Sequence, residues 1–337
     1  MKFPLLSTLT AALLFSAAAT PTPAQTPSAA PTHNVILVHG AWANGSSWSK
    51  VIPLLEAKGL HVVAVELPLT SLDDDVATVQ RAIALEDGPV LLVGHSYGGV
   101  VITEAGNDPK VSGLVYVAAF APGDKASINS LSQGGTPPPG IAELRPDAQG
   151  FLKLTPKGVS EDFAQDLTPA EKAEITATQG PTNAKVLGGT ITTAAWHKKP
   201  SWYVVSANDR MIPPDAERGM AKAIHADTIT LPSSHVAMLS HPAPVAALIE
   251  KAAASTKYTL STNHRAVSQL TRVSPSKSEF VRRLGFRPNT SYIGRKKSIS
   301  GHAIFFNRLK APVLRLLIQK INRTHHPRGI VQQHIDA

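Results

Sequence analysis

Short apolar runs alternate with segments of helical periodicity along most of the chain. Most of these runs carry apolar side chains at successive positions, which is typical of strands buried on both faces of a sheet. The runs are Asn34–Val38, His61–Leu67, Val90–Val93, Val111–Phe120, Trp202–Ala207 and Asp227–Leu231. Strands of this kind separated by helices predict an α/β fold, with a mostly parallel sheet flanked by helices.

The helical segments between these runs have apolar residues at spacings of three or four. Their predicted bounds are Ser46 or Ser47 to Lys58, Asp73 to the Gly88-Pro89 break, Pro213 or Pro214 to Ala226, and Pro244 to Ala254. A further helical segment follows the run that begins at Val90. Strands and helices therefore alternate on both sides of one interruption.

That interruption begins at Ala121 and ends at about Lys199. It starts with a Gly- and Pro-rich piece and continues with the helix-like stretches Ser160–Leu167 and Pro169–Thr178. An insertion of this length after a strand of the sheet is typical of a lid over a site. We therefore predict a mainly helical cap at residues 121–199.

Residues 1–24 have the pattern of a secretory signal peptide. Lys2 provides a positive start, Phe3–Ala19 is apolar, and small residues ending at Ala19 and at Ala24 mark two candidate cleavage positions. The Pro-, Ala- and Thr-rich residues 25–32 predict a disordered spacer. We therefore expect an exported protein, periplasmic or secreted. Because the sequence contains no cysteine, its core alone must stabilise the fold.

The basic charge of the chain is concentrated at its C-terminal end. The formal net charge is +9, but residues 258–337 hold 15 Lys and Arg against 2 Asp and Glu, so the rest of the chain is mildly acidic. This change separates a domain at residues 33–257 from a basic extension at residues 258–337. Apolar residues recur every four positions in the extension at Leu309, Val313, Leu317 and Ile321.

This spacing is compatible with a basic amphipathic helix that makes a weak contact with an anionic surface. The simpler interpretation, which we adopt, is a poorly ordered extension. No nucleic-acid-binding motif accompanies the charge, so we expect no nucleic-acid partner.

The run that begins at Val90 leads into Gly94-His95-Ser96-Tyr97-Gly98. G-x-S-x-G between a buried strand and a helix is the context of a nucleophile elbow, a sharp turn that exposes a serine hydroxyl. The flanking positions are glycines because a side chain there would crowd the turn. We therefore predict Ser96 as a nucleophile.

A serine hydroxyl needs a base that takes its proton, and the base needs a carboxylate that orients it. Asp209 and His235 each follow a predicted strand, in the chain order Ser, acid, His that such elbows use. The other residues considered lie inside the elbow, beside a glycine, on the surface or at helix edges. They are His39, His61, His95, His225 and His241 for the base, and Glu104, Asn208 and Asp215 for the acid.

Acyl transfer also needs N–H donors for the oxyanion that forms. The first is the backbone N–H of Tyr97, and the second is expected from Ala41 in the loop after the first strand. Gly40, Trp42 and Trp196 are candidate residues of the substrate pocket.

Several motifs together resemble the α/β-hydrolase superfamily. They are His39-Gly40-Ala41-Trp42, the G-H-S-Y-G-G elbow, the Asn208-Asp209-Arg210 turn, and S-H-V-A-M-L-S-H-P from Ser234. They look most like the branch that holds plant methylesterases, hydroxynitrile lyases and bacterial esterase-like proteins, over about residues 33–257. The resemblance implies a Ser96–His235–Asp209 triad without a cofactor, under a mostly helical cap.

The same resemblance bears on lyase activity. Hydroxynitrile lyases of that branch carry threonine where Gly40 stands and lysine where Val236 stands, and both are missing here. We therefore expect a serine carboxylesterase that cleaves small apolar esters through an acyl-enzyme on Ser96. The alternatives are a hydroxynitrile lyase or another non-hydrolytic triad enzyme, and a small-molecule binding protein with negligible turnover.

Overall fold

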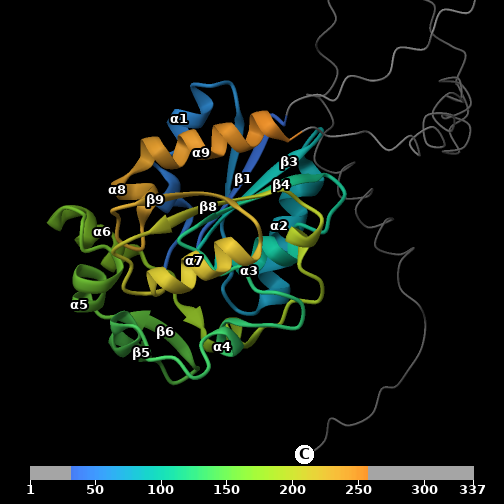
Figure 1. Ribbon diagram of the computed structural model, residues 1–337. Coiled ribbons are helices and arrows are strands. Elements are labelled where there is room, and N and C mark those ends of the chain that lie inside the picture. Colours follow the sequence, from blue (N-terminus) through green and yellow to red (C-terminus); the bar gives the residue numbers. More distant parts are fainter. Residues whose placement is uncertain (1–31, 257–337) are drawn as a thin grey trace, which may run out of the picture. The chain divides into compact units, whose positions relative to one another are not determined.

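The structure is a computed structural model that describes residues 32–256 (Figure 1). The signal peptide, most of the spacer and the basic extension lie outside the described residues and stay predictions. Thr32, the last residue of the predicted spacer, is buried and hydrogen-bonded to the hydroxyls of Ser112 and Thr256. Thr32 therefore packs with the domain, and the predicted boundaries at residues 25–32 and 257 stay predictions.

Six strands form one parallel sheet in the order β2-β1-β3-β4-β8-β9. The strands are β1 Asn34–Val38, β2 His61–Val65, β3 Val90–His95, β4 Val111–Val117, β8 Ser201–Ser206 and β9 Asp227–Leu231. Each coincides with a predicted run, and β1, β3 and β8 are buried along their whole length. The α/β prediction is therefore confirmed.

The strand order reverses beside β1. The chain passes from β1 outward to β2 and then returns to the other side of β1 to form β3. In open parallel sheets, ligand sites lie at the carboxyl ends of the strands at such a reversal. The loop after β1 and the turn after β3 meet at this place.

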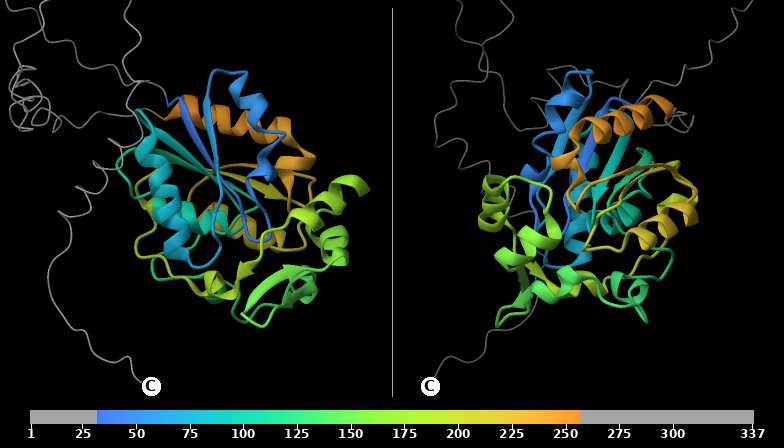
Figure 2. Two further views of the ribbon diagram at one scale, coloured as in Figure 1. Left: turned by 180° about the vertical axis from the view of Figure 1, so that it is seen from behind. Right: turned by 60° about the vertical axis from the view of Figure 1, so that its left-hand side comes forward.

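Helices cover both faces of the sheet (Figures 1 and 2). On one face α1 (Ile52–Glu56) packs against α9 (Pro242–Ser255). On the other face lie α2 (Leu72–Leu85), α3 (Gly98–Ala105) and α7 (Pro214–Ala223). A short helix, α8 (Ala237–Ser240), precedes α9.

The first predicted helix is interrupted in the structure. A 3₁₀ turn at Gly45–Trp48 is followed by α1, which has Pro53 at its second position. Proline has no backbone N–H and is favoured at the start of a helix, so it separates the two pieces.

The insertion between β4 and β8 is more mixed than the sequence predicts. Its helical elements are α4 Ile128–Leu131, η2 Pro139–Glu143, α5 Pro156–Gly158, η3 Val159–Phe163, α6 Pro169–Thr178, η4 Ala184–Gly188 and η5 Ala195–His197. It also contains an antiparallel sheet of β5 (Leu144–Pro146), β6 (Phe151–Leu154) and β7 (Thr182–Asn183). These strands have three, four and two residues, too few to produce a readable alternation.

Only α6 begins and ends where the sequence predicts, and Thr168 and Glu171 form a capping box at its start. The predicted helix Ser160–Leu167 is reduced to the single π-helical turn Val159–Phe163. Among the helices of residues 32–256, none is long and apolar enough to cross a membrane.

Candidate active site

Ser96 lies in the tight turn between β3 and α3, with a backbone φ of 54°. A non-glycine residue in this left-handed region is strained, and such strain is typical of a functional turn. A Cβ atom on Gly98 would lie only 2.5 Å from Val38 O, so the end of β1 leaves no room for a side chain there. The packing of β1 against the turn therefore explains the second glycine of the motif.

Asp209 and His235 are brought together from the ends of β8 and β9. His235 Nδ1–H donates to Asp209 Oδ2 at 2.5 Å, and both side chains are buried. The other oxygen, Asp209 Oδ1, accepts the backbone N–H groups of Met211 at 2.6 Å and Ile212 at 2.9 Å. The loop after β8 thus fixes the Asp209 carboxylate, and this carboxylate orients the His235 imidazole.

The His235 ring is packed between two other rings. Phe163 of the cap lies 5.2 Å away and His95 of the elbow 4.8 Å away, between ring centroids. His95 Nε2–H also donates to the backbone carbonyl of His235 at 2.9 Å. Burial holds the pKa of His95 well below its usual value, so this histidine is neutral. His95 therefore supports the His235 loop, although it lies next to Ser96.

His235 Nε2 is the atom that would face a nucleophile. It is buried, and no donor or acceptor among residues 32–256 pairs with it. Ser96 Oγ is likewise not hydrogen-bonded to His235 within this part of the chain. Such contacts are often long without substrate and tighten when it binds.

The backbone N–H groups of Ala41 and Tyr97 are free to bind a ligand. Within the described domain, neither donates to another residue, whereas the neighbouring Trp42 N–H donates to Thr182 Oγ1 at 3.0 Å. The Tyr97 side chain is anchored elsewhere, because its O–H donates to Asp75 Oδ2 at 2.7 Å. Burial raises the pKa of Asp75 to about 6.

A cavity of about 560 Å³ opens beside Ser96. Its walls are mainly apolar, and Ala41, Trp42 and Tyr97 are among the lining residues. The apolar side chains that line it come from the cap, from the loop between β8 and α7, and from α7: Ile128, Leu131, Ile141, Leu144, Leu187, Met211, Ile212 and Met220. None of its lining residues carries a formal charge.

Two of the predicted pocket residues are not among those that line this cavity. Trp196 donates its indole N–H to Pro122 O at 2.9 Å and packs on His197, so it belongs to the cap's own packing. Gly40 lies beneath the nucleophile: a Cβ there would be 2.6 Å from Ser96 Cβ. Trp42 is the only one of the three that lines the cavity.

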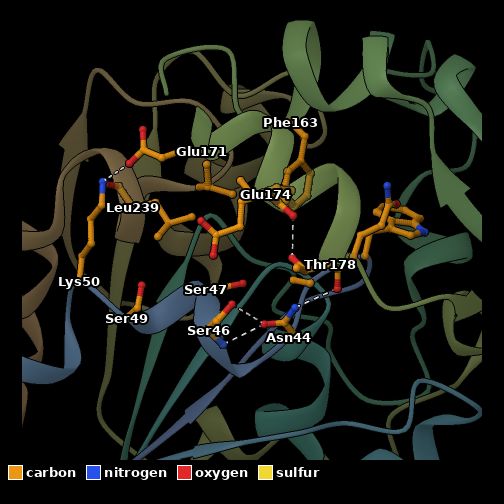
Figure 3. A pocket seen from close by; sticks show the side chains of 15 residues that line it. Asn44, Ser46, Ser47, Ser49, Lys50, Phe163, Glu171, Glu174, Thr178 and Leu239 are labelled. Atoms are coloured by element: carbon orange, nitrogen blue, oxygen red, sulfur yellow. Dashed lines mark hydrogen bonds and ion pairs between the residues drawn. The ribbon is translucent and has the colours of Figure 1, made fainter. Parts of the chain in front are cut away.

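A smaller pocket of about 160 Å³ lies between Gly45–Trp48 and α6 (Figure 3). Lys50 and Glu171 face each other across it at 2.5 Å, and Lys50 also donates to Leu239 O at 2.9 Å. Trp42 lines this pocket as well, but Ser96, Asp209 and His235 do not. Across residues 32–256, no cluster of His, Asp or Glu side chains is arranged to hold a metal ion.

The comparisons with known proteins agree with this architecture. The profile of the alpha/beta hydrolase family matches residues 35–248. An alpha-hydroxynitrile lyase from Arabidopsis thaliana is 29% identical over 249 residues, 62% of this chain and 93% of the relative. A pyrethroid hydrolase from Sphingobium wenxiniae is 26% identical over 256 residues, 64% of this chain and 86% of the relative. Methylesterase 8 from Arabidopsis thaliana is 29% identical over 210 residues, 55% of this chain and 75% of the relative.

Solved structures show the same fold. A pyrethroid hydrolase from Sphingobium faniae JZ-2 has a TM-score of 0.58 at 24% identity, covering 66% of this chain and 97% of that one. The esterases and hydrolases among the sequence relatives support a hydrolase of the esterase type. The family that the motifs indicated is confirmed: the chain belongs to the α/β-hydrolase family.

Proposed function

We propose that this protein is a serine carboxylesterase that uses Ser96 as nucleophile, His235 as general base and Asp209 as the orienting acid. The observation that carries the proposal is the buried hydrogen bond of 2.5 Å between His235 Nδ1 and Asp209 Oδ2. It leaves Nε2 as the basic atom of the imidazole. The strained turn at Ser96 supports the nucleophile.

The reaction proceeds in two halves. Ser96 Oγ attacks the ester carbonyl carbon while its proton moves to His235 Nε2, and Asp209 stabilises the resulting imidazolium. The tetrahedral adduct breaks its bond to the alcohol oxygen, which takes the proton from His235. A water molecule then attacks the acyl-enzyme with the same base, releasing the acid and restoring Ser96. The free N–H groups of Ala41 and Tyr97 stabilise the oxyanion in both halves.

The cavity indicates which esters fit. Its volume of about 560 Å³ accommodates an apolar group well beyond an acetyl moiety. Because no charged side chain lines it, a carboxylate or phosphate on the substrate would lose its hydration without a compensating charge. We therefore propose uncharged esters with at least one apolar arm as substrates.

The lyase alternative is weaker, although one relative is a hydroxynitrile lyase. The threonine of those lyases would have to stand at position 40, where even a Cβ would lie 2.6 Å from Ser96 Cβ. Val236 replaces their lysine, and the cavity beside Ser96 has no charged lining residue, so the described site offers no cation to departing cyanide. We expect no release of cyanide from mandelonitrile above background, and cyanide release that disappears in Ser96→Ala would favour the lyase.

The direct test replaces Ser96 and His235 and follows hydrolysis of p-nitrophenyl esters. Ser96→Ala and His235→Ala should each lower kcat by about 10⁴-fold or more. His241→Ala is the matched control, because His241 heads α9 and, within residues 32–256, its ring bonds only to Ser240. This variant should retain near wild-type rates. Rates that survive in Ser96→Ala would refute the nucleophile. A wild type that stops at one equivalent of product would favour the binding protein.

We also propose that residues 1–24 direct export. To test this, the protein is expressed, the periplasmic and cytoplasmic fractions are collected separately, and the N-terminus of the protein in each fraction is sequenced. A mature chain that begins just after Ala19 or Ala24 supports export, and an intact Met1 in the cytoplasmic fraction contradicts it.

A further inference from the structure

Glu217 is a fully buried carboxyl group in a helix that is otherwise largely polar. It lies on α7, and its side chain has no solvent exposure. Glu217 Oε2 accepts the backbone N–H of Ser206 at 3.0 Å, at the end of β8. No N–H or hydroxyl group of residues 32–256 donates to the other oxygen, Oε1. One side of this carboxyl therefore lacks a donor.

The charged and titratable groups around Glu217 do not neutralise it. Asp209 is a second carboxyl, which repels a negative charge. Tyr203 faces Glu217 but donates its O–H to the carbonyl of Ala119. Arg218 is half exposed and pairs with Asp215, and His235 is bonded to Asp209. In the described part of the chain, an ionised Glu217 would thus be a buried charge without a counter-ion, which is strongly unfavourable.

The protonated form resolves both difficulties. Burial and the neighbouring Asp209 raise the pKa of Glu217 well above its ordinary value, which favours the protonated form. A neutral carboxyl carries one O–H, and that proton needs an acceptor when it is buried. Oε1 is the oxygen that lacks a donor, and Asp209 is the neighbouring carboxyl that raises the pKa of Glu217, so a proton on Glu217 has Asp209 as its nearby acceptor. Asp209 already accepts two backbone N–H groups and the His235 N–H, as an ionised carboxylate does.

We propose that Glu217 is a neutral carboxylic acid that donates its Oε1 proton to Asp209 and so positions the Asp209 carboxylate for His235. The pair then shares a single negative charge. Glu217 is a positioning residue, since it contacts neither the cavity nor Ser96. Its role in catalysis rests on the proposed function of Asp209 and His235, but its protonation does not.

The first experiment measures protonation without relying on activity. Wild type, Glu217→Gln and the control Asp215→Asn, which alters an exposed acid of the same helix, are melted between pH 5 and pH 9. Glutamine is neutral and donates an N–H to Asp209 at every pH.

The sign follows from linkage. The raised pKa means that the folded wild type binds this proton more tightly than the unfolded chain, so its stability falls as pH rises above the unfolded value. We expect the melting temperature of Glu217→Gln, relative to wild type, to rise with pH, by up to about 3–5 °C per pH unit while the folded wild type keeps this proton. The difference between Asp215→Asn and wild type should not change with pH. A difference between Glu217→Gln and wild type that is constant from pH 5 to pH 9 would overturn the proposal.

The second experiment tests positioning through ester hydrolysis. Glu217→Gln should retain kcat/KM within about threefold and keep the acid limb of its pH profile, because glutamine is also neutral and also donates a hydrogen bond to Asp209. Glu217→Leu removes the donor and should lower kcat at least tenfold with little change in KM. A Glu217→Leu enzyme that is folded and fully active would refute the positioning role.

If Glu217→Leu does not fold, Glu217→Gln still tests the proposal. A shift of about one pH unit in the acid limb of its pH profile would contradict it. If the wild type has no esterase activity, the proposed function fails, while the melting experiment still decides the protonation.

Discussion

Replacing Gly98 by alanine tests how closely the nucleophile turn packs against β1. A Cβ at position 98 would lie 2.5 Å from Val38 O and 2.7 Å from His39 O. Ordinary contact begins at 3.4 Å, so the start of α3 must move by about 0.9 Å from the end of β1. Both obstacles are backbone atoms, which cannot rotate away as a side chain can.

The size of the effect follows from this displacement. Overpacking of this kind costs about 1–3 kcal/mol. For a domain of this size each kcal/mol lowers the melting temperature by about 2–4 °C, so we expect a fall of about 2–12 °C. The displaced segment carries Ser96 and the Tyr97 N–H, and a displacement of about 1 Å in a reacting group lowers the rate on the order of 10²-fold.

The assay combines thermal melting with kcat/KM on a p-nitrophenyl ester. Gly123→Ala is the matched control, because its Cβ would meet its nearest neighbour, an atom of Trp196, at an ordinary 3.7 Å. That variant should melt within about 2 °C of wild type at an unchanged rate. A Gly98→Ala protein that melts within 1 °C of wild type and keeps half its activity would refute the packing argument.

Three further outcomes follow from the structure. Asp209→Asn should lower kcat about 10⁴-fold, since an amide cannot hold His235 in the required tautomer, and steady-state kinetics that find less than a tenfold loss would contradict this. Burial raises the pKa of Asp75 to about 6, so the folded wild type becomes less stable as pH rises from 4 to 6 and Asp75 loses its proton. The melting temperature of Asp75→Asn, measured relative to wild type, should therefore rise over this range, and a difference that falls would contradict the prediction. Ala216→Trp adds bulk at a residue that lines the cavity, so hydrolysis of an octanoate ester should fall much more than hydrolysis of an acetate ester. Rates measured across an acyl-chain series test this, and equal losses would show that acyl chains do not enter the cavity.

The sheet and the turn at Ser96 follow from local features of the sequence. Strands buried on both faces must be apolar at every position, so their runs are visible without any structure. The glycine at position 98 is required by contacts with the end of β1, and such constraints leave a fixed spacing around the serine. Asp209 and His235 are found because each follows a strand, and the carboxyl ends of parallel strands meet at one edge of the sheet.

Other features depend on how distant segments pack, and no local pattern contains them. The strands of the cap are too short to have a period, and Trp196 turns toward Pro122 rather than the cavity. Phe163 reaches His235 only because the cap folds back over the sheet. Glu217 looks like one more polar residue of an exposed helix, yet it is buried against the turn that holds Asp209. Burial is a property of the assembled fold, so tertiary structure alone decides which of the two acidic residues of α7 is removed from water.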